Sequence, residues 1–151
     1  MLRIAICCKG GFSSSTMAAS LEKQVLDKHL ENRASFQFFP FSALYGAFNN
    51  FGAGAATHER QDEVDVALLC PHLEYSLKRD VDKLRIPCFV LPTRLYGALP
   101  VEHLIEEAED VLELWNKGAT NPITFPDEPR SMSAPRAVSH RRWVAQQRGQ
   151  A

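Results

Sequence analysis

Short apolar runs that end at glycine or proline, alternating with amphipathic stretches, constrain the fold of this chain most strongly. The runs lie at residues 3–8, 35–41, 65–70 and 87–91. Their length and their breakers are typical of buried parallel strands. Apolar residues at helical spacing predict helices up to about residue 32, from 42 onward, at 73–84 and at 101–115. This alternation predicts a small open α/β domain with a parallel sheet and right-handed crossovers.

The helix predicted at residues 101–115 has the clearest pattern. Its apolar positions follow one stripe: Val101, Leu104, Ile105, Ala108, Val111, Leu112 and Trp115. Acidic residues occupy much of the other face: Glu102, Glu106, Glu107, Glu109, Asp110 and Glu113. The stripe is therefore expected to pack on the sheet, with the acidic face turned away from it.

Charge and composition divide the chain at about residue 116. Residues 1–116 carry 11 Lys and Arg against 16 Asp and Glu, whereas residues 117–151 carry six against two. The second part is rich in proline, and its only periodic segment is a weak basic helix predicted at 139–147. We expect one domain over 1–116 and a disordered basic tail over 117–151. Five tail residues either solubilise the chain or contact an anionic membrane surface: Arg136, His140, Arg141, Arg142 and Trp143.

Composition argues against several classes of protein. The net charge of −1 gives no argument for nucleic-acid binding. No apolar run is long enough for a signal sequence or a membrane span, so we expect a soluble cytoplasmic protein. The four cysteines, at positions 7, 8, 70 and 88, lack the spacing of a zinc site and are expected to be thiols. We predict no metal and no cofactor.

The segment between the first strand and the first helix carries the chemistry. Cys8 is followed there by Lys9, Gly10, Gly11, Phe12, Ser13, Ser14 and Ser15. Glycines let the backbone turn its N–H groups inward, and the helix that follows adds the positive end of its dipole. A cysteine in that field is favoured as a thiolate, which makes it a nucleophile for a phosphoryl group. The alternative is an ordinary strand-to-helix turn preceded by two buried cysteines.

Three motifs carry a resemblance to a known family. The pattern Cys8-x-x-Gly11-Phe12-Ser13-Ser14-Ser15 resembles the active-site loop of phosphotransferase-system enzyme IIB components of the lactose/chitobiose (cellobiose) type. Two further stretches agree in order: residues 65–71 (DVALLCP), with Tyr75 four residues on, and Leu95-Tyr96-Gly97. The resemblance covers about residues 3–115.

The resemblance implies a fold and a reaction. It implies a four-stranded parallel sheet in the order 2-1-3-4, with helices on both faces. It also implies that Cys8 accepts phosphate from a phosphohistidine on enzyme IIA, with residues 9–15 as the phosphate loop. Cys8 would then donate the phosphate to a sugar, expected to be a β-linked disaccharide, at the membrane enzyme IIC. The expected carrier is a monomer that visits the inner face of the membrane transiently.

The chain departs from the family pattern near the predicted site. Cys70-Pro71-His72 stands where the family usually has Gly-Pro-Gln, and residues 48–57 resemble an insertion. Cys70 is interpreted as a small core residue, with a regulatory disulfide to Cys8 as the alternative. His72 either touches the phosphate or a partner, or is a solvated residue at a helix start. Tyr96 either packs beside the active loop or is an ordinary buried aromatic.

Two other functions compete with the carrier. A low-molecular-weight phosphatase also begins its loop with cysteine, but it needs an arginine six residues later, where this chain has Ser14. The sequence shows no evident Asp-Pro loop that would supply a general acid. Asp80 is the only aspartate in reach of a late loop, and it is expected in the middle of a helix. The third hypothesis is a non-catalytic regulatory relative that keeps the fold, and the Cys8 loop argues against it.

Overall fold

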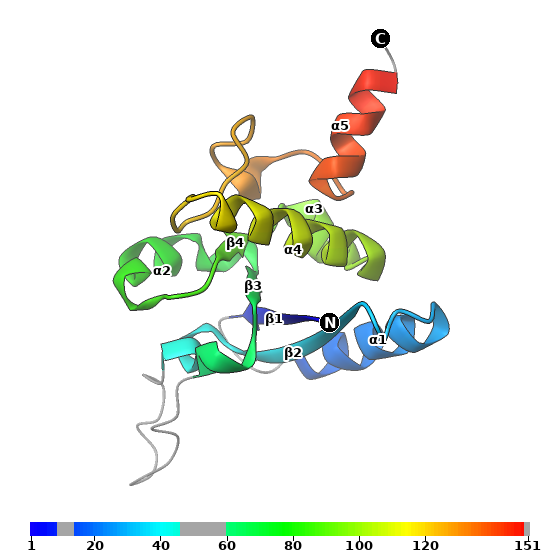
Figure 1. Cartoon of the computed structure of the whole chain (residues 1–151), viewed down its shortest axis with the longest axis horizontal. Coiled ribbons are helices and arrows are strands. Elements are labelled where there is room, and N and C mark those ends of the chain that lie inside the picture. Colours follow the sequence, from blue (N-terminus) through cyan, green and yellow to red (C-terminus); the bar gives the residue numbers. More distant parts are fainter. Residues whose placement is uncertain (9–13, 46–59, 150–151) are drawn as a thin grey trace, which may run out of the picture.

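Four parallel strands form one sheet in the order β2-β1-β3-β4 in the computed structural model, which describes residues 1–8, 14–45 and 60–149 (Figure 1). The strands are β1 (Leu2–Cys8), β2 (Ala34–Pro40), β3 (Val66–Leu69) and β4 (Cys88–Val90). They coincide with the four apolar runs, so the predicted fold class and strand order are confirmed. Because all strands run in one direction, their carboxyl ends, including Cys8, lie at one edge of the sheet.

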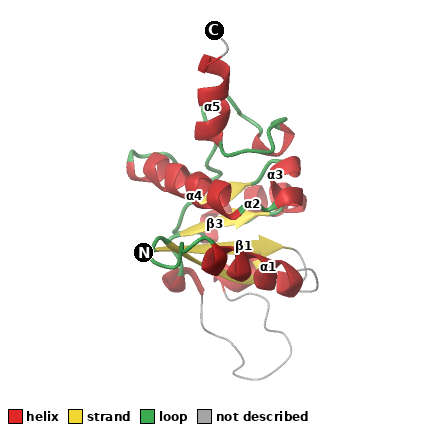
Figure 2. Cartoon of the chain, turned by 90° about the vertical axis from the view of Figure 1, so that its right-hand side faces the viewer, coloured by secondary structure: helices red, strands yellow, loops and turns green. Residues whose placement is uncertain are grey.

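Helices cover both faces of this sheet (Figure 2). One face is packed against α1 (Ser14–Asp27), α3 (Thr93–Ala98) and α4 (Val101–Asn116). The other is packed against α2 (Glu74–Arg79) and the 3₁₀ helices η1 (Phe41–Tyr45) and η3 (Pro71–Leu73). Alternate strand residues serve the two cores, as Ile4 and Ile6 do on the α4 side and Ala5 and Cys7 on the α2 side.

Several helices are shorter than the sequence predicts. α1 ends at Asp27 and not near residue 32, because His29 takes a left-handed backbone conformation (φ 56°) and Leu30 N–H returns to the Val25 carbonyl at 2.9 Å. The helix predicted at 73–84 is divided between α2 and the 3₁₀ helix η4 (Val81–Lys83). Where a helix is predicted from residue 42 onward, the described residues up to 45 form the 3₁₀ helix η1. Residues 46–59, with the supposed insertion, lie outside the described residues.

Residues 117–149 correct the expectation of a disordered tail. Ile123 and Phe125 are only 1% and 4% exposed and belong to the same core as Phe89. Ile123 N–H donates to the Cys88 carbonyl at 3.1 Å, and the Asn121 side chain accepts from Cys88 N–H at 2.8 Å. The segment therefore covers the outer edge of β4, which would otherwise present unpaired backbone groups. It ends in α5 (His140–Gly149), which confirms the basic helix predicted there (Figure 1).

The acidic face of α4 holds this C-terminal segment in place. Arg136 is fully buried and pairs with Glu107 at 2.6 Å, and Arg142 pairs with Glu106 at 2.8 Å. Both glutamates face away from the sheet as predicted, but the segment buries them. Arg136 is therefore unavailable to a membrane surface, which corrects that alternative for this residue.

A pH dependence of stability follows from Glu106. Hydrogen bonding from Arg142 lowers the pKa of Glu106 to about 2, although burial opposes the shift. A carboxyl with a lowered pKa stabilises the folded chain above its unfolded pKa of about 4.3, and this stability is lost as the pH falls toward 2. We expect Glu106→Gln to lower the free energy of unfolding near neutral pH and to have little effect near about pH 2. Urea unfolding at both pH values measures this, and an equal cost at both would contradict it.

Candidate functional site

Cys8 occupies the end of a central strand. It is the last residue of β1, opposite Pro40 of β2, and it is 5% exposed. β1 lies between β2 and β3, so Cys8 sits near the middle of the carboxyl edge of the sheet. In parallel α/β sheets this edge is where ligands bind.

The helix that follows Cys8 supplies a field that favours anions. α1 begins at Ser14, so the chain passes from Cys8 to a helix N-terminus within a short connection. The first N–H groups of a helix have no partner in the helix and carry its positive partial charge. Of the predicted phosphate loop, Lys9 through Ser13 lie outside the described residues, and Ser14 and Ser15 open α1.

The remaining predicted site residues lie on the elements that follow β3 and β4. Cys70 comes directly after β3, and its N–H donates to the Cys7 carbonyl at 3.0 Å, which places it next to Cys8 in the strand register. His72 is exposed in η3. Tyr96 is half-buried in α3 and packs against both cores. The structure therefore brings Cys70 beside Cys8.

The other two cysteines are buried more deeply than Cys8. Cys7 is 0% exposed, and burial raises its pKa well above that of an ordinary thiol. Cys88 is also 0% exposed, its pKa is raised by burial, and its Sγ donates to the Ile86 carbonyl at 3.5 Å. Both side chains therefore belong to the buried core. Both thiols are held in the neutral form, which leaves them poor nucleophiles.

Asp80 does not occupy the position expected for it. Asp80 lies between the end of α2 and the start of η4. It therefore joins two short helices and does not lie in the middle of one. Its buried carboxylate pairs with Arg79 at 2.9 Å and with Lys83 at 3.6 Å. These contacts give Asp80 a structural role in the turn after α2.

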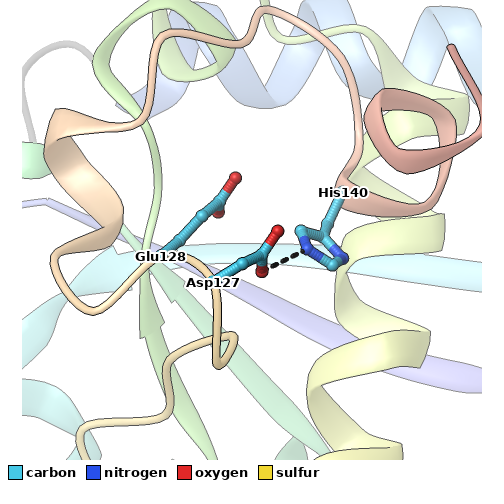
Figure 3. A group of neighbouring side chains, drawn as sticks. All are labelled: Asp127, Glu128 and His140. Atoms are coloured by element: carbon cyan, nitrogen blue, oxygen red, sulfur yellow. Dashed lines mark hydrogen bonds and ion pairs between the residues drawn. The ribbon is translucent and has the colours of Figure 1, made fainter. Parts of the chain in front are cut away.

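A second polar cluster lies in the C-terminal segment. Figure 3 shows Asp127, Glu128 and His140, with the His140 ring bonded to Asp127 at 2.9 Å. Arg136 donates to both carboxylate oxygens of Glu128, at 2.9 Å each. The His140 ring also stacks on Phe125, with centroids 3.8 Å apart. Because a guanidinium already occupies the Glu128 carboxylate, the group fits an ion-pair network better than a metal site.

Part of the C-terminal segment reaches the carboxyl edge of the sheet, which the sequence did not predict. Met132 packs on the core cluster that contains Cys8, and its carbonyl accepts from Thr93 Oγ1 at 3.2 Å. Arg130 forms two hydrogen bonds with Glu74, at 2.9 and 3.2 Å. The sequence offers no signal for this placement. Met132 is a single apolar residue between two serines, and the contacts of Met132 and Arg130 are with residues far away in the chain.

Comparisons with known proteins found a structural likeness but no matching sequence family. No protein-family model and no curated protein matches the chain. Among solved structures, it is similar to the lactose-specific IIB component domain of the phosphoenolpyruvate:carbohydrate phosphotransferase system from Streptococcus pneumoniae. The sequence identity is 15% and the TM-score 0.40, and the match covers 77% of this chain and 95% of that chain. In the part of the chain that the structure describes, no helix has the length and apolar character needed to cross a bilayer.

Proposed function

We propose that this chain is a phosphocarrier of a sugar phosphotransferase system. Cys8 accepts a phosphoryl group from a phosphohistidine on enzyme IIA and passes it to a sugar held by the membrane enzyme IIC. One observation carries this proposal: Cys8 ends a central parallel strand and lies one short glycine-containing connection before the N-terminus of α1. That arrangement suits a thiolate nucleophile and a bound oxyanion.

The chemistry needs positioning and charge neutralisation. The Cys8 thiolate attacks the phosphorus, an S–P bond forms, and the N–P bond to the donor histidine breaks. The backbone N–H groups of residues 9–15 and the first turn of α1 hold the three phosphoryl oxygens, and Lys9 adds a positive charge. Fixed donors of this kind stabilise the charge that develops during phosphoryl transfer.

Residues on the neighbouring elements complete the proposed site. His72 is exposed in η3, at the same edge of the sheet as Cys8, and is suited to contact a partner protein. Tyr96 packs against both cores from α3 and would support the edge from the β4 side. The resemblance assigns a β-linked disaccharide as the sugar, a cytoplasmic monomer as the carrier, and a transient visit to the inner face of the membrane.

The phosphatase alternative is less well supported by the residues. Ser14, the first residue of α1, stands where the phosphatase loop needs a bidentate arginine. Asp80 is engaged by Arg79 and Lys83, so it is poorly suited to act as a general acid. Without these groups a phosphocysteine would persist long enough to meet its acceptor, as a carrier requires.

Phosphate acceptance without hydrolysis tests this function. Mixed with a phosphorylated enzyme IIA, the full chain is expected to take up one phosphoryl group and to retain it until a sugar-loaded enzyme IIC is added. Labelled phosphate bound to the chain measures uptake, and released inorganic phosphate measures hydrolysis. Rapid release of phosphate, or turnover of p-nitrophenyl phosphate, would instead identify a hydrolase.

A further inference from the structure

We infer that Cys8 and Cys70 form a reversible intramolecular disulfide, so that Cys70 is a resolving thiol for the nucleophilic cysteine. The argument for the disulfide itself rests on the positions of the two thiols and does not require phosphate transfer. Its consequence for phosphate transfer rests on the proposed function of Cys8.

The strand register places these two cysteines side by side. Cys7 pairs with Leu69 in the ladder between β1 and β3, and Cys70 N–H donates to the Cys7 carbonyl. Cys8 ends β1 and Cys70 follows the last residue of β3, so each cysteine lies one residue beyond that pair. Neighbouring strands lie about 4.8 Å apart, within the Cα separation of about 4.4–6.8 Å that a disulfide spans. Both side chains belong to one buried cluster, so they lie on the same side of the sheet.

The other two cysteines are poorly placed to bond with Cys8. Cys7 belongs to the same buried cluster, but it is the adjacent residue of the same strand. Consecutive Cα atoms lie about 3.8 Å apart, below the separation of about 4.4–6.8 Å that a disulfide spans. Cys88 pairs with Ala67, three residues before Cys70, so it lies toward the opposite end of the strands. Cys7 and Cys88 are 0% exposed, against 5% for Cys8 and 3% for Cys70. Cys8 and Cys70, which occupy equivalent positions on neighbouring strands, are therefore also the two thiols with access to solvent.

A peroxide supplies the oxidising equivalents for this bond. The Cys8 thiolate attacks one oxygen of hydrogen peroxide, the O–O bond breaks, and the products are a sulfenic acid on Cys8 and hydroxide, which is protonated to water. The Cys70 sulfur then attacks the Cys8 sulfur, and the sulfenic oxygen leaves with two protons as a second water. Two thiols and one peroxide thus give one disulfide and two waters. A dithiol reductant restores both thiols by exchange.

The disulfide would switch the carrier off without damaging it. A sulfur bonded to Cys70 cannot attack a phosphohistidine, whereas a phosphorylated Cys8 cannot react with peroxide. Oxidation and phosphorylation therefore exclude each other at one atom. Cys70 also protects Cys8, because a sulfenic acid without a resolving thiol proceeds to the irreversible sulfinic acid.

Peptide mapping of the full chain tests the pairing without any phosphate donor. The reduced protein is treated with hydrogen peroxide, its remaining thiols are alkylated, and it is digested with trypsin without reductant. We expect residues 4–9 to be linked to residues 61–78 in monomeric protein, and the link to disappear after dithiothreitol. Intermolecular links, oxidation of Cys8 without a link, or no oxidation at Cys8 would each overturn the inference.

Single variants identify the sulfur atoms that take part. Cys7→Ala is the matched control, since residues 4–9 also contain Cys7, and it is expected to keep the link to residues 61–78. Cys8→Ala and Cys70→Ala are expected to lose it completely, with Cys8 of the Cys70→Ala protein found as sulfinic acid. A link that survives Cys8→Ala would contradict the pairing. The map of the unsubstituted chain stands by itself should a variant fail to fold.

A second readout separates this inference from the proposed function. If the chain accepts phosphate, peroxide is expected to abolish acceptance and dithiothreitol to restore it, while prior phosphorylation prevents the link. If the chain accepts no phosphate but forms the link, the carrier function fails and the pairing stands. Acceptance that continues undiminished in the linked protein would overturn the proposed role of Cys8.

Discussion

Replacing Arg136 with alanine is expected to destabilise the folded chain by about 3–5 kcal/mol. The guanidinium is fully buried between two carboxylates, 2.6 Å from Glu107 and 2.9 Å from Glu128. It also donates to the Val138 carbonyl at 2.9 Å. Removing it leaves two buried negative charges without their common partner, which is one of the costlier changes a protein interior can undergo. The shift of the urea unfolding midpoint at constant slope measures the loss.

A matched control comes from the same segment. Arg141 pairs with Asp110 at 2.8 Å on the surface, and its side chain is 42% exposed, so Arg141→Ala is expected to cost at most about 1 kcal/mol. Neutralising the orphaned carboxylates with Glu107→Gln and Glu128→Gln in the Arg136→Ala protein should recover part of the loss. An equal, small effect of Arg136→Ala and Arg141→Ala would show that the C-terminal segment does not bury its arginine.

Cys8→Ser is expected to abolish phosphate acceptance completely. The serine hydroxyl has a much higher pKa than a thiol, so it offers no anionic nucleophile at neutral pH, although its size and position are similar. The fold should be retained, since the substitution changes one atom at the end of β1. Transfer of labelled phosphate from a phosphorylated enzyme IIA measures the loss.

Cys7→Ser is the neighbouring control for this substitution. Cys7 is fully buried, with a pKa raised by burial, so its replacement should leave the label in place. A Cys8→Ser protein that still takes up phosphate, on a histidine or another residue, would contradict the proposed nucleophile.

The sheet was predictable because parallel strands buried on both faces appear in sequence as uninterrupted apolar runs. Residues 65–70 and 87–91 show this directly, and the structure has strands within both. No single apolar run determines the order of the strands in the sheet. The predicted order came from the family resemblance that the Cys8 loop and two further motifs carry. The closeness of Cys8 and Cys70 depends on that order, because it requires β3 to lie next to β1.

The sequence predicts a disordered tail where the structure has an ordered C-terminal segment, because the contacts that stabilise this segment are long-range. Ile123 and Phe125 are isolated apolar residues among prolines, too few to show a period, and their burial depends on the open edge of β4. Helical periodicity places Glu107 on the face of α4 opposite the apolar stripe, which agrees with its contact to the C-terminal segment. Its burial depends on Arg136, a partner that helical periodicity does not reveal.

The sequence and the structure contribute different parts of the argument for the proposed phosphate loop. The residue types after Cys8 suggest an anion-binding turn, and the structure adds the position of Cys8 at the carboxyl edge and the start of α1 at Ser14. In the proposed reaction, fixed hydrogen-bond donors stabilise the charge of the phosphoryl group, and the sheet sets the position of Cys8.

Locating the phosphoryl group on the phosphorylated chain is the most direct test of the carrier function. After incubation with a phosphorylated enzyme IIA, peptide mass mapping should find one phosphoryl group on residues 4–9, with fragmentation assigning it to Sγ of Cys8. A phosphoryl group on a histidine or serine elsewhere, or a chain that stays unphosphorylated beside a competent donor, would contradict it.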